Sequence, residues 1–236
     1  LMDSYINKSS GVDPKSGWEE YIGNYIDNDN ITLIKHGHSG QTIKMFIDGR
    51  STYHYCDWTS IKKQFGRGDY VIIALGTNDN SRLEGTHQTE KYSVDQFKTW
   101  YKDIISDVKA KGANIILLTP PPANSSVSNG EFCARTSVAR TALLELATEA
   151  NVDVIDITQA YAVAINEYAK ANNLSTSDLQ VKYENNKIVA SGKIFVDSVH
   201  FTAVGAELLA KTVAEQIALI DTGLENYIKK QKKIVW

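Results

Sequence analysis

The chain has 236 residues, of which 42% are hydrophobic, and its formal net charge is −3 at pH 7. This length and composition are enough to bury one sizeable core, so a single domain spanning 1–236 is predicted. The small negative charge argues against the broad basic face that nucleic-acid binding needs, and no apolar run reaches the length that spans a membrane.

Four short β-branched or apolar runs are predicted as strands. The second and third are apolar on both faces, which is typical of strands covered on both sides in a parallel sheet. Amphipathic helical runs lie between the strands, and Gly112 is expected to end one of them. The strands are expected at 31–34, 70–75, 114–119 and 152–156, and the helices at 18–26, 94–111, 137–150, 158–171 and 202–220.

The alternation of strands and helices predicts an α/β fold, a three-layer doubly wound sandwich with a mainly parallel central sheet. In such sheets ligands bind beyond the carboxyl ends of the strands, so residues directly after each strand are the first candidates for a site. Residues 180–195 break the alternation. Asn185-Asn186 lies there between two short alternating runs, which predicts an inserted hairpin.

The segment Asp197-Ser198-Val199-His200 precedes the last predicted helix, for which Thr202 is a suitable N-cap. A turn of this length can direct the carboxylate at one ring nitrogen of His200 and leave the other nitrogen to take a proton. Two thirds of a nucleophile-activating triad therefore lie in one segment. If the chain holds no serine or cysteine partner, the alternative is a surface ion pair.

Three other positions are candidates for the rest of such a site. Gly40 follows the first predicted strand, where glycine permits an exposed backbone N–H, although a plain glycine turn also fits. Asn78 follows the second strand, where its amide can donate to an oxyanion or form an Asx turn. Ser4 is the candidate nucleophile, although a serine so near a terminus is more often part of a frayed tail.

Taken together and in this order, the four segments resemble the blocks of the SGNH (GDSL-type) hydrolase superfamily. Asp3-Ser4 resembles the nucleophile block, Gly40 the glycine block, Gly76-Thr77-Asn78-Asp79 the asparagine block, and the Asp197–His200 segment the closing block. Three further segments resemble the rhamnogalacturonan acetylesterase-like carbohydrate esterases of that superfamily, namely Gly17-Trp18, Gly49-Arg50 and Gly68-Asp69-Tyr70-Val71.

The resemblance implies a flavodoxin-like SGNH fold and a carboxylic ester hydrolase that removes acetyl groups from a plant-type polysaccharide or oligosaccharide. It implies that Ser4 is the nucleophile, that His200 is the general base and acid, and that Asp197 orients the imidazole. The oxyanion hole would consist of the backbone N–H groups of Ser4 and Gly40 and the side-chain amide of Asn78.

No metal or organic cofactor is implied. The expected partner is an acetylated carbohydrate, with no nucleic acid and no membrane, and the oligomeric state is left open. The substrate class implies a secreted or extracellular protein, although no signal peptide is visible in this chain.

Two alternatives to a carbohydrate acetylesterase are kept. A lipid or thioester hydrolase of the same superfamily would need an apolar acyl channel, and no long apolar loop near the four blocks obviously supplies one. A non-catalytic carbohydrate-binding relative would follow if Ser4 were displaced. Met2, which stands where the family usually has glycine, makes that alternative worth testing.

The two ends of the chain suggest an unusual strand. The family's first strand precedes the serine, where this chain has only Leu1-Met2, yet the chain ends in the apolar run Ile234-Val235-Trp236. One hypothesis is a circular permutation in which 234–236 complete the first strand. The objection is that permutation breaks usually fall in exposed loops. The alternatives are a chain trimmed upstream and a boundary inside a larger protein.

The remaining cysteines and histidines have open interpretations. Cys56 and Cys133 either form one disulfide or stay as buried thiols. His36 and His38 flank Gly37 near the predicted site, where they could contact substrate. His54 lies in the aromatic run 53–58, which either stacks on sugar rings or packs under a loop, and His87 is expected in a surface loop.

Overall fold

The computed structural model describes residues 15–37, 40–49 and 57–229, and these fall into two compact units that alternate along the sequence. The first unit comprises Lys35–Pro120 and Thr136–Asp156, and the second comprises 15–34, Pro121–Arg135 and 157–229. A single domain over 1–236 stays a prediction. The proposed strand of residues 234–236 lies outside the described residues.

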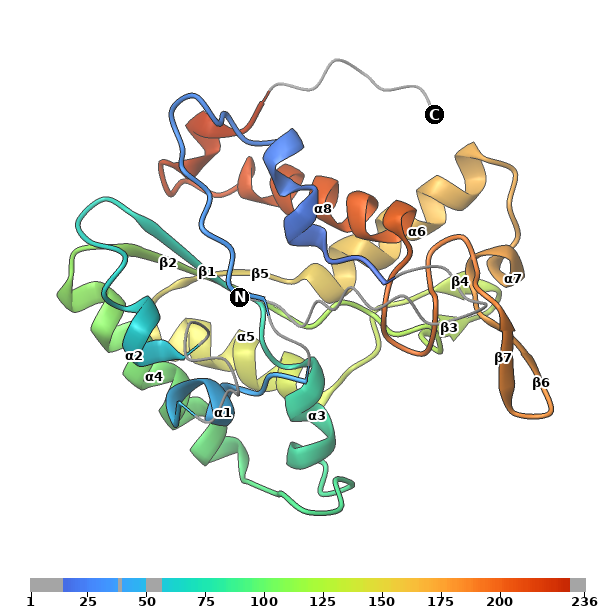
Figure 1. Ribbon diagram of the computed structural model, residues 1–236, viewed down its shortest axis with the longest axis horizontal. Coiled ribbons are helices and arrows are strands. Elements are labelled where there is room, and N and C mark those ends of the chain that lie inside the picture. Colours follow the sequence, from blue (N-terminus) through green and yellow to red (C-terminus); the bar gives the residue numbers. More distant parts are fainter. Residues whose placement is uncertain (1–14, 38–39, 50–56, 230–236) are drawn as a thin grey trace. The chain divides into compact units, whose positions relative to one another are not determined.

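A parallel three-stranded sheet in the order β1-β2-β5 forms the centre of the first unit (Figure 1). Ile73 pairs with Leu117, and Leu118 pairs with Ile155, so the carboxyl ends of the three strands meet at one edge. The sheet confirms the predicted parallel α/β fold and three of the four predicted strands. The strands are β1 Tyr70–Ile73, β2 Asn114–Leu118 and β5 Asp153–Ile155.

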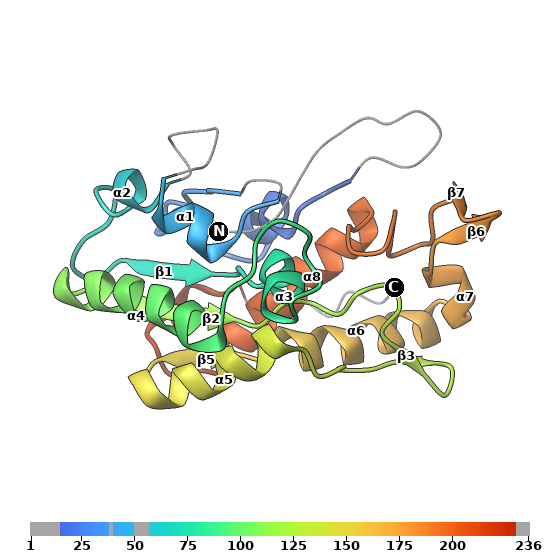
Figure 2. The same ribbon diagram turned by 90° about the horizontal axis from the view of Figure 1, so that it is seen from below.

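The described residues of the first unit form five helices, and the two longest, α4 and α5, pack on each other and on β2 (Figure 2). The Ser93 hydroxyl caps α4 by accepting a hydrogen bond from Gln96 N, and Gly112, at φ +70°, lies just after its end as predicted. The core between helices and sheet includes Phe97, Tyr101 and Ile73. The helices are α1 Ile43–Ile47, α2 Trp58–Ile61, α3 Thr77–Leu83, α4 Val94–Ala110 and α5 Val138–Ala150.

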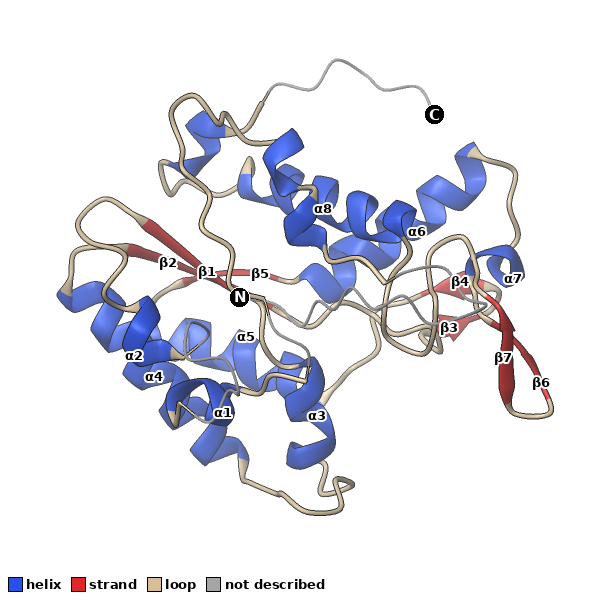
Figure 3. Cartoon of the chain, in the orientation of Figure 1, coloured by secondary structure: helices blue, strands red, loops and turns tan. Residues whose placement is uncertain are grey.

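Where it is described, the second unit is mainly helical, with two small hairpins (Figure 3). Its largest helices, α6 and α8, pack on each other, and η1 packs on α8. The elements are η1 Trp18–Glu20, η2 Ile22–Asn24, β3 Val127–Ser128, β4 Glu131–Phe132, α6 Ile157–Ala171, α7 Thr176–Leu179, β6 Lys182–Glu184, β7 Lys187–Ala190, α8 Ala203–Ile217 and η4 Leu224–Tyr227. None of the helices in the described ranges is long and apolar enough to cross a membrane.

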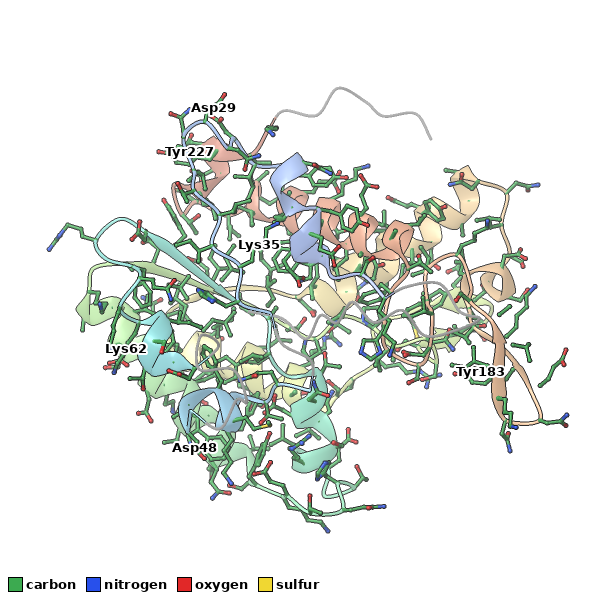
Figure 4. All side chains as sticks on the ribbon, in the orientation of Figure 1. Asp29, Lys35, Asp48, Lys62, Tyr183 and Tyr227 are labelled. Atoms are coloured by element: carbon green, nitrogen blue, oxygen red, sulfur yellow. The ribbon has the colours of Figure 1, made fainter. Side chains whose placement is uncertain are left out.

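The hairpin predicted within 180–195 is confirmed by the antiparallel pair β6-β7. Asn185 and Asn186 both have positive φ angles, +49° and +62°, which asparagine tolerates better than most residues and which a two-residue hairpin turn requires. Tyr183 lies on this hairpin (Figure 4) and is 49% exposed. The hairpin therefore presents an aromatic ring to solvent.

Three predicted elements are wrong in type or extent. Residues 31–34 form no strand, because a strand needs a hydrogen-bonded neighbour that the described residues do not provide there, and Ile34 is 58% exposed. Residues 18–26 form two short 3-10 turns rather than one helix, since Gly23 and Asn24 are poor helix formers and Ile26 bridges to Ile228. The last helix ends at Ile217 and not at 220.

Candidate active site

The closing turn brings Asp197 and His200 into direct contact. His200 Nδ1 lies 2.8 Å from Asp197 Oδ2 and 2.9 Å from Oδ1. Oδ1 also accepts hydrogen bonds from the backbone N–H groups of Val199, at 3.0 Å, and of His200, at 2.8 Å. The carboxylate thus closes its own turn and fixes the ring through Nδ1. A proton held at Nδ1 leaves Nε2 as the basic nitrogen.

Buried neighbours on both sides hold this turn in shape. The backbone N–H of Val196 donates to the His200 carbonyl at 3.0 Å, and Phe195 forms a β-bridge with Phe201. Both phenylalanines are buried, with ring centroids 5.3 Å apart. Asn124 N donates to the Ser198 carbonyl at 2.9 Å from a different loop. The turn is therefore anchored by core packing as well as by its own hydrogen bonds.

The charge of Asp197 is stabilised by its neighbours. Burial acts to raise the pKa of Asp197, but hydrogen bonds from His200, Lys15 and the backbone outweigh burial and hold the pKa well below its usual range. Asp197 is therefore ionised at neutral pH. An ionised carboxylate against Nδ1 stabilises a positive imidazole, as a general base requires.

In the first unit, the segments that contain Gly40 and Asn78 lie side by side. Asn78 is the second residue of α3, and its Nδ2 donates to the carbonyl of Gln41 at 3.3 Å. Gly40, at φ +71°, is exposed and in the left-handed region that favours glycine. Arg82 Nη1 donates to the Asn78 carbonyl at 2.6 Å. The structure thus brings together the two predicted oxyanion-hole residues of this unit.

Beneath these two segments lies a buried carboxylate whose importance the sequence did not reveal. Asp79 is fully buried, and its Oδ1 accepts hydrogen bonds from Ile43 N, at 3.2 Å, and from the Tyr92 hydroxyl. Burial raises the pKa of Asp79 to about 6, although hydrogen bonds from Tyr92 and Ile43 oppose the rise. The available signal was an aspartate in the short segment that follows an apolar strand, one residue beyond Asn78.

Gly76 determines how the chain passes from β1 into α3. Its φ is +139°, and a Cβ added there would lie 2.9 Å from Pro120 Cγ, which is closer than real Cβ contacts. Only glycine fits this angle and this space without rearrangement. Pro120 begins the proline run after β2, so the exits of two neighbouring strands pack on each other and set where Asn78 begins its helix.

The remaining residues singled out in the sequence either lie outside the described residues or have a defined place in the structure. Ser4, His38, His54 and Cys56 lie outside the described residues, as do Met2 and Asp3. His87 lies in a loop as predicted, where its Nδ1 accepts a hydrogen bond from Glu90 N at 3.2 Å. Cys133 is a free thiol that donates to the Ser126 carbonyl at 3.6 Å. In the described part of the chain, no three His, Cys, Asp or Glu residues are grouped as a metal site would require.

A parallel α/β unit with an asparagine segment after β1 and a glycine segment beside it, and an Asp–His turn in the other unit, are typical of the class of SGNH-type esterases. A model of the GDSL-like Lipase/Acylhydrolase family matches residues 3–208, and the chain belongs to this family. The match spans all four segments identified in the sequence. The chain is therefore an ester hydrolase by family.

Individual relatives agree with the family assignment. The chain is 26% identical over 231 residues to the probable rhamnogalacturonan acetylesterase YesY of Bacillus subtilis, and the match covers 98% of this chain and 96% of that one. The crystal structure of YxiM from Bacillus subtilis superimposes with a TM-score of 0.64 at 24% identity, covering 92% of this chain and 54% of that chain. The structure of Axe2, an acetylxylan esterase from Geobacillus stearothermophilus, superimposes with a TM-score of 0.56 at 20% identity, and the match covers 92% of this chain and 84% of that chain. These two structures establish the shared fold.

Proposed function

We propose that this protein is a serine esterase that removes O-acetyl groups from a plant-type polysaccharide or its oligosaccharides. The observation that carries the proposal is the contact between His200 Nδ1 and both oxygens of an ionised Asp197. A surface ion pair would not need a turn closed by two backbone N–H groups and anchored by buried phenylalanines. The similarity to YesY, which extends over nearly the whole of both chains, supports the choice of substrate class.

In the proposed mechanism Ser4 is the nucleophile. Its Oγ attacks the acetyl carbonyl while His200 Nε2 takes the hydroxyl proton, so that a C–O bond forms and the carbonyl oxygen becomes an oxyanion. Collapse of this intermediate breaks the bond to the sugar oxygen, which leaves as an alcohol with the proton from His200. Water then attacks the acetyl-serine with the same assistance, releasing acetate and restoring Ser4.

The oxyanion would be stabilised by the backbone N–H groups of Ser4 and Gly40 and by Asn78 Nδ2. In the structure Nδ2 donates to the Gln41 carbonyl at 3.3 Å, a long hydrogen bond that an oxyanion can replace. The bond from Arg82 to the Asn78 carbonyl holds the backbone of Asn78 while its side chain changes partner. Asn78 therefore supplies a donor on a fixed support.

The first test is the replacement of the proposed nucleophile. Ser4→Ala is expected to abolish hydrolysis of p-nitrophenyl acetate and to leave the circular dichroism spectrum unchanged. Ser9→Ala, in the same N-terminal stretch, is the matched control and should keep wild-type activity. Near wild-type activity in Ser4→Ala would overturn the proposal. Labelling of the wild type, but not of Ser4→Ala, by a serine-directed fluorophosphonate separates an esterase from a carbohydrate-binding relative.

The second test concerns the substrate. Acetate release from acetylated rhamnogalacturonan and from acetylated xylan should exceed cleavage of long-chain p-nitrophenyl esters. A preference for long acyl chains would instead indicate the lipid or thioester hydrolase alternative. Because such polysaccharides lie outside cells, we also propose that the protein acts extracellularly. Measurement of the protein in culture medium and in the cell fraction of its native host tests this location.

A further inference from the structure

A second cation contacts the carboxylate of the closing turn. Lys15 Nζ lies 2.8 Å from Asp197 Oδ2, the same oxygen that lies 2.8 Å from His200 Nδ1. The side chains of Lys15 and Asp197 are 27% and 20% exposed, so water screens this pair only in part. The proposed mechanism gives Lys15 no role.

The backbone holds Lys15 beside the turn. The next residue, Ser16, donates its N–H to the Phe201 carbonyl at 3.1 Å and forms a β-bridge with Phe201. Gly17 N then donates to Glu20 Oε1 at 3.1 Å, which fixes the entry to η1. The ion pair thus joins two segments that are already paired through their backbones. Less side-chain entropy is lost in such a pair than in one between unconnected surface residues.

The groups that act on the Asp197 carboxylate differ in charge. Lys15, from the segment before η1, carries a full positive charge, and His200 can acquire one. Among the described residues the other contacts are neutral, since they come from the backbone N–H groups of Val199 and His200. Asn124, from the loop packed against the turn, contacts the Ser198 carbonyl and is also neutral. Lys15 and His200 therefore share one negative charge.

We propose that Lys15 sets the lower end of the enzyme's pH range by sharing the charge of Asp197 with His200. The lysine offsets part of the negative charge that would otherwise stabilise a protonated imidazole, and it also repels that proton directly. His200 therefore remains an unprotonated base at lower pH than it would beside Asp197 alone. Lys15 is a positioning residue in this scheme, since it acts through Asp197, and the inference rests on the proposed function.

The test is the pH dependence of kcat/KM for p-nitrophenyl acetate in the wild type, Lys15→Met and Lys15→Arg. In Lys15→Met the midpoint of the acid limb should rise by roughly 0.5–1 pH unit, so that activity below the midpoint falls about 3- to 10-fold. The plateau value of kcat/KM at higher pH should be the same as in the wild type. Lys15→Arg should match the wild type because it keeps the charge. Salt at about 1 M should shrink the shift through screening.

A matched control removes a lysine from the same unit that pairs with another carboxylate. Lys211 Nζ lies 3.8 Å from Glu215 on α8, and Lys211→Met should leave the midpoint unchanged. An unchanged midpoint in Lys15→Met would overturn the proposal. So would a uniform loss of activity at every pH, which would show that Lys15 only supports the shape of the turn. Thermal melting of each variant checks that the fold is intact.

A second readout separates this proposal from the proposed function. The ring protons of His200 can be followed by NMR against pH in Ser4→Ala and in Ser4→Ala/Lys15→Met, with His200→Gln used for assignment, and no turnover is needed. A higher titration midpoint without Lys15 supports the charge sharing even if the wild type proves inactive on every ester. Equal midpoints refute the charge sharing even if the wild type is an active esterase.

Discussion

The backbone N–H of Ile43 donates a hydrogen bond to the buried carboxylate of Asp79, 3.2 Å away. Ile43 begins α1 directly after the loop that carries Gly40, and Asp79 follows Asn78 in α3. One buried group therefore joins the two segments that carry the proposed oxyanion donors. The Tyr92 hydroxyl donates to the same carboxylate oxygen and attaches the start of α4 to this junction.

Replacement of Asp79 should make stability depend differently on pH. The folded-state pKa of Asp79, raised by burial to about 6, lies above the ordinary value of 3.8, so folding favours the protonated acid. That contribution is fully present below about pH 4 and is lost as the pH rises through 6. Asp79→Asn, which stays neutral, should gain stability relative to the wild type between pH 4 and 7 by on the order of 2–3 kcal/mol.

Urea unfolding of both proteins at pH 4, 5, 6 and 7 measures this difference. A free-energy difference that stays constant across the range would contradict the assignment of Asp79 as a buried acid. Asp79→Ala is the companion variant, because it removes the acceptor for Ile43 and Tyr92 altogether. It should be less stable than Asp79→Asn at every pH.

Replacement of Asn78 should mainly lower catalysis, whereas replacement of the nearby Asn80 should mainly lower stability. Asn78→Ala removes the proposed oxyanion donor, so kcat should fall by roughly 10²–10³ with little change in KM. Asn80 Oδ1 accepts a hydrogen bond from Ala139 N at 2.9 Å, near the start of α5, so Asn80→Ala should cost about 1 kcal/mol of stability. Steady-state kinetics and urea unfolding on both variants test the contrast. A larger loss of kcat in Asn80→Ala would argue against the role of Asn78.

Glycine is required at position 76 by both angle and space. Gly76→Ala combines φ +139° with a methyl group 2.9 Å from Pro120 Cγ, so we expect about 2–4 kcal/mol of destabilisation and a displaced Asn78. Gly68→Ala is the matched control, since its φ is also positive, at +85°, but an added Cβ would meet nothing within 4 Å. It should cost about 1 kcal/mol and retain activity. Equal losses in thermal melting would show that the contact with Pro120 is unimportant.

Thr202 should couple the stability of α8 to the closing turn. Thr202 lies two residues after His200. Its hydroxyl accepts a hydrogen bond from Gly205 N at 3.0 Å and donates one to the Lys193 carbonyl at 2.7 Å. Thr202→Ala is expected to cost about 1–2 kcal/mol and to reduce kcat, because the helix start and the turn share this anchor. Thr202→Ser, which keeps the hydroxyl, should restore most of both. Failure of serine to restore stability would mean that the methyl packing dominates.

The sequence predicted well wherever a pattern is local. The helical stripe from Phe97 to Val108 predicted the bounds of α4 to within one residue, since the capping signals lie within a few positions of the helix ends. Asn185-Asn186 gave the hairpin for the same reason. The spacing of Asp197 and His200 also predicted their contact, because a three-residue turn limits where the two side chains can go. Their catalytic role, with that of Ser4, stays a prediction.

Other features needed partners far away in the sequence. Residues 31–34 read as a strand, but strand formation depends on a neighbouring ladder that local sequence does not encode. In the sequence Asp79 is recognisable only as the last residue of the asparagine block. Its burial depends on Tyr92, Ile43 and the core around them. No local pattern singled out Lys15, because its partner Asp197 lies more than 180 positions away. The backbone pairing of Ser16 with Phe201 brings the two side chains together.

By itself, then, the sequence determined the parallel α/β architecture, the family and the contact within the Asp–His turn, because periodicity, short motifs and short turns act over a few residues. Tertiary structure alone decided which charged residues far apart in the sequence meet. It buried Asp79 beneath Asn78 and raised its pKa, and it set Lys15 against Asp197. The physical reason is that burial and Coulomb interaction depend on distance through space, which chain folding sets and sequence separation does not reveal.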